Sequence, residues 1–251
     1  MTNRFFVDHS VSRWDSGEAL LSGDEAHHFC KVMRGKVGDS LVLFDGTGTY
    51  AHGIAEAVQT EGIRIRITGT FADEVESPLR LTVASALPKG DRQRFLIEKL
   101  AELGVARFVP VLMERSVARA NGAVIQRLQR YVIEAAKQCG RNVLMEITEE
   151  VPIHKLNDLF ASETITKFLL HPVALGSVGQ TTPRQVFSHL AGTPLSSTRI
   201  VVLAGPEGSF TDQEVEAMLY KGFQPFDLGK RILRTETACI AAAALLLTYA
   251  G

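Results

Sequence analysis

The sequence predicts an α/β protein with a small β-rich N-terminal domain, residues 1–75, and a larger α/β domain, residues 76–251. Short apolar runs with tight turns fill the first part, and strands alternate with helices in the second. Between them the acidic segment Asp73–Pro78 ends in proline, which is typical of a domain boundary. With 251 residues, 45% apolar and 22% charged, the chain has globular composition and suits two modest domains.

The N-terminal domain is predicted to be a small β-barrel or sandwich. Asp45-Gly46 is a strong turn dipeptide after an apolar run. One helix interrupts the strands: Ser22–Glu25 has the pattern of a capping box, so we expect a helix through Ala26–Met33 that stops at Gly35. Strands are predicted at Arg4–Val7, at Ser40–Phe44 and within Gly48–Phe71, where Ile63–Ile67 alternates most clearly.

The second domain is predicted to hold a mostly parallel sheet, because strands and helices alternate along it. Its apolar run Ala238–Leu247 is about half as long as a membrane span requires and predicts a buried helix. Thr211–Glu214 forms a second capping box. Strands are expected at Leu79–Leu87, Arg107–Met113, Val143–Ile147, Lys167–Leu170 and Arg199–Ala204, and helices at Asp91–Leu103, Ala123–Cys139, Lys155–Ala161, Arg184–Leu190, Thr211–Tyr220 and Thr235–Tyr249.

Charge is unevenly distributed although the net charge is −1. Residues 80–141 contain twelve Lys and Arg and five Asp and Glu, a net charge of +7. Such clustering is typical of a nucleic-acid binder. Solvated helix faces explain it equally well on charge alone.

Cysteines and the N-terminus exclude several classes. Cys30, Cys139 and Cys239 form no CxxC pair, so we expect neither a disulfide framework nor a zinc site. We therefore expect the protein to occupy a reducing compartment. His27-His28 with Cys30 lacks a second ligand pair, so no metal is expected. Residues 1–5 do not resemble a signal peptide, and we expect no membrane association.

The loop Gly205-Pro206-Glu207-Gly208 is the most informative stretch. It follows a strongly apolar strand, and ligands of open α/β sheets bind on loops at the carboxyl ends of strands. Its glycines permit close approach of a ligand to the backbone. Glu207 is not needed as a helix cap, which favours a ligand-facing role; a plain surface turn is the alternative. The loop is neither a P-loop nor a GxGxxG motif.

A second informative stretch, Asp227–Ala238, leads into the last helix. Thr235 is a candidate cap for this helix, and Glu236 suits its positive end. The helix dipole disfavours Arg234 there, so Arg234 indicates either an anionic partner or a solvated side chain. His171, which ends the strand before it at the carboxyl edge, is a candidate pocket residue.

Basic residues cluster around the two helices of segment 80–141. Phosphate contact is the functional interpretation, and solvated helix faces are the alternative. Glu98 and Glu102 lie at i,i+4 on the first helix and are explained by helix support alone. The basic and polar residues concerned are Lys89, Arg92, Arg94, Lys99, Gln138 and Arg141.

Taken together, these stretches resemble the RsmE family of SPOUT-type RNA methyltransferases. The motifs together span almost the whole chain. Gly205–Gly208 and Leu228–Ala238 are specific motifs, whereas Arg4-Phe5-Phe6-Val7 is weak by itself. They are Arg4-Phe5-Phe6-Val7; His28 with Val32-Met33-Arg34; Lys89-Gly90-Asp91-Arg92; Lys99–Val105; Gln138-Cys139-Gly140-Arg141; Leu170-His171-Pro172; Gly205–Gly208; and Leu228–Ala238.

The resemblance implies S-adenosyl-L-methionine as methyl donor and the N3 atom of a uridine in 16S ribosomal RNA as acceptor. It further implies a PUA-like RNA-binding barrel at 1–75, an α/β domain with a deep trefoil knot at 76–251, a homodimer and a cytoplasmic location. The donor pocket implied by the motifs comprises Leu170, His171, Leu203, Gly205, Pro206, Glu207, Gly208, Leu228, Ile232, Leu233 and Thr235. The implied RNA contacts are Arg34, Lys89, Arg92, Arg94, Lys99 and Arg141.

Three positions depart from the family pattern: Ser209 stands where Gly is usual, Leu144-Met145 where Pro is common, and Lys137 where Glu is frequent. They affect loop flexibility and charge more than the core motifs.

Methylation at N3 requires removal of a proton, because uridine N3 is protonated at neutral pH. Glu207, Glu236 and Glu102 remain open as bases, and Arg234 or Arg141 are candidates to stabilise the uracil anion. Two other classes stay open: an RNA binder without activity, which needs no ligand-shaped loop at Gly205–Gly208, and a nucleotide-dependent small-molecule enzyme, whose glycine-rich fingerprint is absent.

Overall fold

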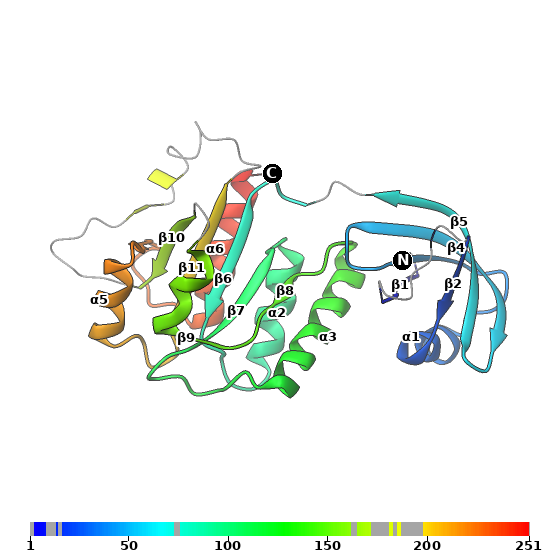
Figure 1. Ribbon diagram of the computed structural model, residues 1–251, viewed down its shortest axis with the longest axis horizontal. Coiled ribbons are helices and arrows are strands. Elements are labelled where there is room, and N and C mark those ends of the chain that lie inside the picture. Colours follow the sequence, from blue (N-terminus) through cyan, green and yellow to red (C-terminus); the bar gives the residue numbers. More distant parts are fainter. Residues whose placement is uncertain are drawn as a thin grey trace. The chain divides into compact units, whose positions relative to one another are not determined.

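A computed structural model describes residues 3–8, 14, 17–72, 76–161, 165–171, 181–182, 185–186 and 198–250 (Figure 1). The chain forms two compact units. The first comprises Met1–Glu76 together with Ala136–Leu144, and the second comprises Ser77–Ala135 together with Met145–Gly251. Of the predicted boundary segment, residues 73–75 lie outside the described residues.

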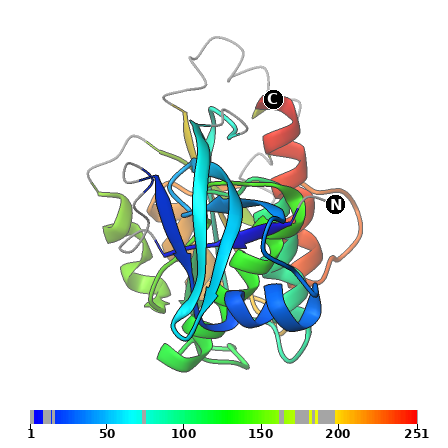
Figure 2. The same cartoon turned by 90° about the vertical axis from the view of Figure 1, so that its right-hand side faces the viewer.

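The first unit is built on a five-stranded sheet of order β1-β3-β4-β5-β2. The long antiparallel pair β4–β5 dominates it (Figure 2), and β1 is parallel to β3. The side chains that alternate inward, among them Phe5, Leu43 and Ile65, are fully buried with Phe29. The strands are β1 (Arg4–Phe6), β2 (Glu18–Leu21), β3 (Ser40–Phe44), β4 (Thr49–Gln59) and β5 (Gly62–Ala72); β2 was not among the predicted strands.

The predicted helix Ala26–Met33 is wrong in type and bounds. The chain forms a short α-helix, α1 (Gly23–His27), followed by a π-helical turn, η2 (His28–Val32). The expected capping box does not form, since Ser22 makes no capping hydrogen bond. The Glu25 carboxylate instead accepts a hydrogen bond from Lys137 Nζ at 2.8 Å, which accounts for lysine at position 137.

The second unit is built on a parallel sheet of order β12-β10-β11-β6-β7-β8, with β9 also paired to β7, as the alternating pattern predicted. Its interior strands are apolar and buried, which is typical of a sheet covered on both faces. The strands are β6 (Arg80–Ser85), β7 (Arg107–Leu112), β8 (Glu146–Ile147), β9 (Val151–Pro152), β10 (Thr166–Leu170), β11 (Arg199–Ala204) and β12 (Gln224–Pro225).

Helices cover both faces of this sheet. α2 (Arg92–Glu102) packs on α6 (Thr235–Ala250), and α6 packs on β6 and β11 (Figure 1). On the other face, η3 (Ile153–Phe160) and α5 (Asp212–Tyr220) bury Leu156 and Met218 in a cluster with Ala84, Val201 and Leu203. α3 (Gly122–Cys139) belongs to the second unit up to Ala135. The run Ala238–Leu247 forms a helix as predicted; Ala242, Ala243 and Leu246 are inaccessible, whereas Leu245 is 40% exposed, so the run is only partly buried.

Two other predictions need correction. The segment Lys155–Ala161 lies in a 3₁₀-helix, η3, rather than an α-helix. The predicted strand Val143–Ile147 is reduced to β8, because Val143 forms an isolated bridge with Thr47 in the first unit. Of the predicted helix Arg184–Leu190 the structure describes only Gln185 and Val186, which are helical, and the rest lies outside the described residues.

Candidate functional site

The carboxyl ends of three neighbouring strands are level with one another. Leu170 of β10 pairs with Ala204 of β11, and Ala204 pairs with Ser85 of β6. The segments that follow these strands therefore emerge side by side at one edge of the sheet. They carry His171, the loop Gly205–Gly208 and the approach to α2, which is where open α/β sheets bind ligands.

The loop Gly205–Gly208 is held from two sides. The Thr235 hydroxyl donates a hydrogen bond to the Gly205 carbonyl oxygen at 2.8 Å, which ties this loop to the start of α6. A Cβ added at Gly205 would lie 2.8 Å from the ring of Phe210, so only glycine fits without displacing that ring. Thr235 is the first residue of α6 itself, and its side chain joins the two motifs that sequence analysis treated separately.

Arg115, which sequence analysis missed, braces the far end of the loop. Its Nη1 donates hydrogen bonds to the carbonyl oxygens of Gly208, at 3.0 Å, and Phe210, at 3.3 Å. Arg115 follows β7, so the same carboxyl-edge rule that selected Gly205–Gly208 identifies it in retrospect. Between the two carbonyls, Ser209 adopts φ +62°, a left-handed conformation that favours glycine.

Arg92 joins the two candidate carboxylates. Its guanidinium lies 3.0 Å from Glu207 Oε1 and 3.9 Å from Glu236 Oε1. The Lys89 backbone N–H also points to Glu207 Oε1, at 3.4 Å. The loop after β6 and the start of α2 therefore contact the other two motifs at the same edge, and Arg92 is engaged by protein carboxylates.

Glu236 is the most enclosed acid of this group, with 5% exposure. Its Oε2 is buried and has no hydrogen-bond partner among the described residues. One turn further along α6, burial raises the pKa of the Cys239 thiol to about 12, with a smaller opposing effect from the Ser85 hydrogen bond. Cys239 is therefore a neutral thiol at pH 7, which leaves Glu236 as the candidate acid in this part of α6.

His171 contributes a second buried polar atom without a described partner, its Nδ1. Its Nε2 lies 3.4 Å from Ser209 Oγ, and its ring packs edge-on against Phe210. Partial burial lowers the pKa of His171 below its ordinary value of 6.5, with Asp212 opposing the shift. A neutral imidazole and the Glu236 carboxyl group therefore both leave hydrogen-bonding capacity at this edge.

The other residues predicted for the donor pocket differ in what they expose. The Leu203 side chain is fully buried in the core, so only its backbone is available for a ligand. Pro206 is buried and Leu170 is 9% exposed. Leu228 and Leu233 are half-buried, whereas Gly208 and Arg234 are exposed. Ile232 is 89% exposed, one of several large apolar side chains at the surface.

Two of the predicted RNA contacts have partners on their own helix. Arg94 pairs with Glu98 at 2.6 Å and lies over the Tyr131 ring, and Lys99 pairs with Glu102 at 2.7 Å. Glu102 closes α2, ten residues from Arg92, so at about 1.5 Å per residue it lies ~15 Å along the helix axis from the residue that contacts Glu207 and Glu236.

The remaining two predicted RNA contacts lie in the first unit. Arg34 is exposed at φ +56° after the π-helical turn. Arg141 is 5% exposed, and its Nε and Nη2 form a bidentate pair with Glu76, each at 2.7 Å. The structure therefore does not present the Arg141 guanidinium as an open cation.

The described residues offer little to other kinds of site. Within the described residues, no cluster of three or more His, Cys, Asp or Glu side chains is arranged to hold a metal ion. The described helices include none with the length and apolar character of a membrane span. The three cysteines are free thiols.

Comparison with known proteins assigns the chain to a family. Residues 75–247 match the RNA methyltransferase domain family, and residues 21–68 match the RNA methyltransferase PUA domain. The ribosomal RNA small subunit methyltransferase E of Synechocystis is 33% identical over 233 residues, which cover 89% of this chain and 71% of that protein.

Solved structures agree with this assignment. A methyltransferase from Legionella pneumophila in complex with the cofactor SAM has a TM-score of 0.84 at 30% identity, covering 99% of this chain and 98% of that one. A ribosomal RNA small subunit methyltransferase E from Neisseria gonorrhoeae bound to S-adenosyl methionine has a TM-score of 0.80 at 30% identity, with the same coverage. The braced loops thus belong to an α/β methyltransferase fold with a PUA domain, and the chain is a member of the RsmE family of RNA methyltransferases.

Proposed function

We propose that this protein methylates the N3 atom of a uridine in the 16S ribosomal RNA of the small ribosomal subunit, with S-adenosyl-L-methionine (SAM) as donor. The loop Gly205–Gly208 carries this proposal. It is tied to Thr235, Arg115 and Arg92 by contacts within the protein, and such bracing is what a positioning catalyst requires. Family membership supplies the reaction class.

The residues at the carboxyl edge fit a nucleoside with charged groups. The loop keeps its close packing on the Phe210 ring only with glycine at position 205, and the buried Nδ1 of His171 and Oε2 of Glu236 have no described partners. The proposed binding residues lie after β10, in the Leu203–Gly208 segment and in the Leu228–Thr235 segment. When bound, SAM supplies a methyl group already activated by its sulfonium centre.

The chain must then position the uridine and accept its proton. As the new N–C bond forms and the S–C bond breaks, the N3 proton passes to a base. Among the three candidate acids, Glu102 lies at the far end of α2 and Glu207 is paired with Arg92 at 3.0 Å. Glu236 has the unpartnered oxygen, so we assign it the role of base. Arg234, exposed beside it, is proposed to stabilise the uracil anion.

RNA binding is proposed to involve both domains. We assign residues 1–75 to a PUA-like barrel and residues 76–251 to a domain with a C-terminal trefoil knot. The sheet order supports the knot, since β12 lies beside β10 rather than beside β11.

The N3 edge is the pairing edge of uracil, so the target base must be unpaired or flipped outward. Membership of the family supports a homodimer, and an RNA substrate in the ribosome supports a cytoplasmic location.

The decisive experiment incubates the protein with labelled SAM and small ribosomal subunits that lack the modification, followed by digestion and mass spectrometry. We expect N3-methyluridine in 16S rRNA, and none with large subunits. Glu236→Gln is expected to lower kcat at least about 100-fold while leaving S-adenosylhomocysteine affinity within a few-fold. Glu102→Gln is the matched control and should retain activity. Absence of methylated uridine with the unchanged protein would refute the proposed function.

Arg141 is tested separately, because it lies in the first unit. Arg141→Ala is expected to weaken methylation while S-adenosylhomocysteine binding survives. Arg141→Lys, which keeps a cation near Glu76, should restore part of the activity if the residue acts by positioning. Unchanged turnover of Arg141→Ala on small subunits would contradict any role of Arg141.

A further inference from the structure

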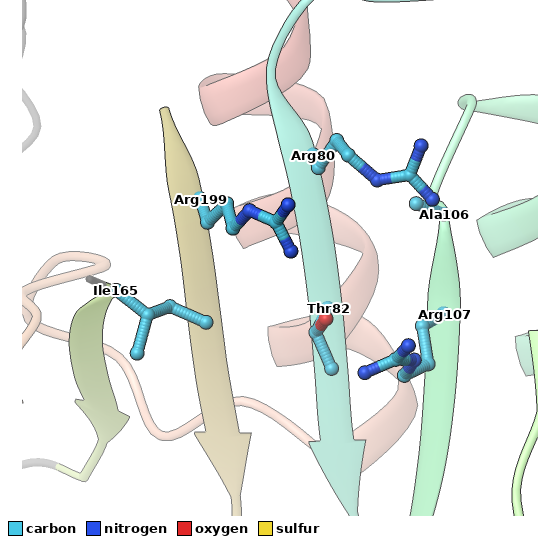
Figure 3. Close-up of a pocket in the computed structure, with 6 residues that line it drawn as sticks. All are labelled: Arg80, Thr82, Ala106, Arg107, Ile165 and Arg199. Carbon is cyan, nitrogen blue, oxygen red and sulfur yellow. The ribbon is translucent and has the colours of Figure 1, made fainter. Parts of the chain in front are cut away.

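The amino edge of the seven-stranded sheet carries a feature that methyl transfer does not use. Three arginines begin three neighbouring strands: Arg199 on β11, Arg80 on β6 and Arg107 on β7. Together with Thr82, Ala106 and Ile165 they line a hollow of about 210 Å³ (Figure 3). Arg80 and Ser85 are five residues apart on β6, so the hollow lies ~16 Å from the carboxyl edge at about 3.3 Å per residue.

Strand register places these side chains on one face. Arg199 is the direct partner of Arg80, and Arg107 is the direct partner of Thr82. Arg80 and Thr82 are two residues apart, so they point to the same side of the sheet. Figure 3 shows the Arg199 and Arg107 side chains directed toward β6 from either side, with Thr82 between them.

Positive charge is concentrated at this edge. Arg199 and Arg80 lie directly opposite each other on neighbouring strands, and both are exposed. Like charges in this position are a cost to a sheet, and an anion between the guanidinium groups offsets that cost. Arg107 Nε donates a hydrogen bond to the Glu146 carboxylate at 2.8 Å, and Glu146 is itself 54% exposed.

The chemistry and size of the hollow indicate the ligand. Arginine forks match the tetrahedral oxygens of a phosphate group, and the Thr82 side chain adds a hydroxyl. A volume of about 210 Å³ is several times the ~30 Å³ share of one water, so a phosphate group with its bound water fits. It is below the range of about 300–1,000 Å³ typical of pockets that enclose a whole small molecule.

We propose that Arg80, Arg107 and Arg199 form a binding site for a single phosphate group at the amino edge of the sheet. The group is either a backbone phosphate of RNA or free inorganic phosphate. The RNA source rests on the proposed function, since it makes the site a second anchor for the ribosomal RNA. The phosphate site itself does not depend on methylation.

The first arm of the test titrates inorganic phosphate into the ¹⁵N-labelled protein at low ionic strength. We expect the backbone amide signals of Arg80, Thr82 and Arg107 to shift in a saturable way. Arg80→Gln/Arg199→Gln should weaken this binding at least about tenfold, since it removes two of three charge-assisted contacts. Arg130→Gln, an exposed arginine on α3, is the matched control and should behave as the unchanged protein. Amides that do not move, or shifts that persist in the double variant, would overturn the site.

The second arm measures affinity for a 16S rRNA fragment at several salt concentrations. If the site holds an RNA phosphate, the double variant loses affinity and its slope of log K against log salt falls by about 0.7–0.9. If RNA affinity is unchanged while phosphate shifts are lost, the site holds free phosphate. All variants should bind S-adenosylhomocysteine normally, so failure of this site is distinguishable from failure of the proposed methyl transfer.

Discussion

The two edges of the seven-stranded sheet treat charge in opposite ways. At the carboxyl edge, Arg92 is surrounded by Glu207 and Glu236, and Thr235 and Arg115 hold the loop carbonyls. At the amino edge, three arginines converge on one hollow. The carboxyl edge is therefore held by contacts between opposite charges and polar groups, whereas the amino edge gathers like charges on neighbouring strands. Substitutions at the two edges should have opposite effects on stability.

The largest expected effect concerns Gly205. Gly205→Ala puts a Cβ 2.8 Å from the Phe210 ring, so either the ring or the loop must move. We expect S-adenosylhomocysteine binding, measured by calorimetry, to weaken about 100-fold, or ~2.8 kcal/mol. Gly122→Ala is the control, because its Cβ meets nothing within 4 Å. Equal affinity of the two variants would show that the loop has no role in donor binding.

Arg92→Gln should be the next most damaging. It removes the cation between Glu207 and the buried Glu236, so we expect a lower melting temperature and about tenfold weaker S-adenosylhomocysteine binding, ~1.4 kcal/mol. Arg94→Gln is the matched control, because Arg94 lies on the same helix but pairs with Glu98 of that helix. If Arg92→Gln instead weakened only RNA binding, Arg92 would be a phosphate contact and the two edges would be more alike than proposed.

Neutralising the amino edge should have a smaller effect of opposite sign. Arg80→Gln/Arg199→Gln removes a like-charge pair on neighbouring strands, so we expect stabilisation by about 0.2–1 kcal/mol in denaturant titrations at low salt. The gain should disappear at high salt, where charge repulsion is screened. Destabilisation at low salt would mean that these arginines already have compensating partners.

The smallest expected effect is the pH response of His171. Its pKa is lower folded than unfolded, so the unfolded chain binds more protons as the pH falls. This contribution to stability is fully present above the ordinary pKa of 6.5 and is lost as the pH drops through the lower folded value. His171→Asn should flatten thermal stability between neutral and mildly acidic pH, whereas His154→Asn, an exposed control, should not. An unchanged profile for His171→Asn would contradict this.

Much of the second unit follows from sequence periodicity. The apolar strand Arg199–Ala204 and the capping box at Thr211–Glu214 both form as predicted, because each depends on neighbours in the chain. For the same reason the rule that ligands bind at carboxyl ends selected Gly205–Gly208 correctly as an edge loop.

Long-range partners explain what sequence reasoning missed. The pairing of Arg92 with Glu207 requires β6 to lie beside β11. The periodicity of apolar residues predicts strands but does not predict their order in the sheet. The capping box at Ser22–Glu25 failed because Glu25 bonds Lys137, more than one hundred residues away. Arg141 looked like an open cation from its motif, yet Glu76 pairs with it. Charged side chains were therefore predicted less well than apolar ones.

The position of β12 has a consequence for synthesis in the cell. Leu169 of β10 pairs with Pro225 of β12, so one flank of β10 keeps unpaired backbone groups until that later segment has been made. At about 5–20 residues per second, this interval lasts roughly 3–11 s on the ribosome. An open strand flank of this kind is a template for misassociation between nascent chains. The segment Gln224–Thr235 thus completes both the sheet and the proposed donor site, and a chain cut before Gln224 would lack both together.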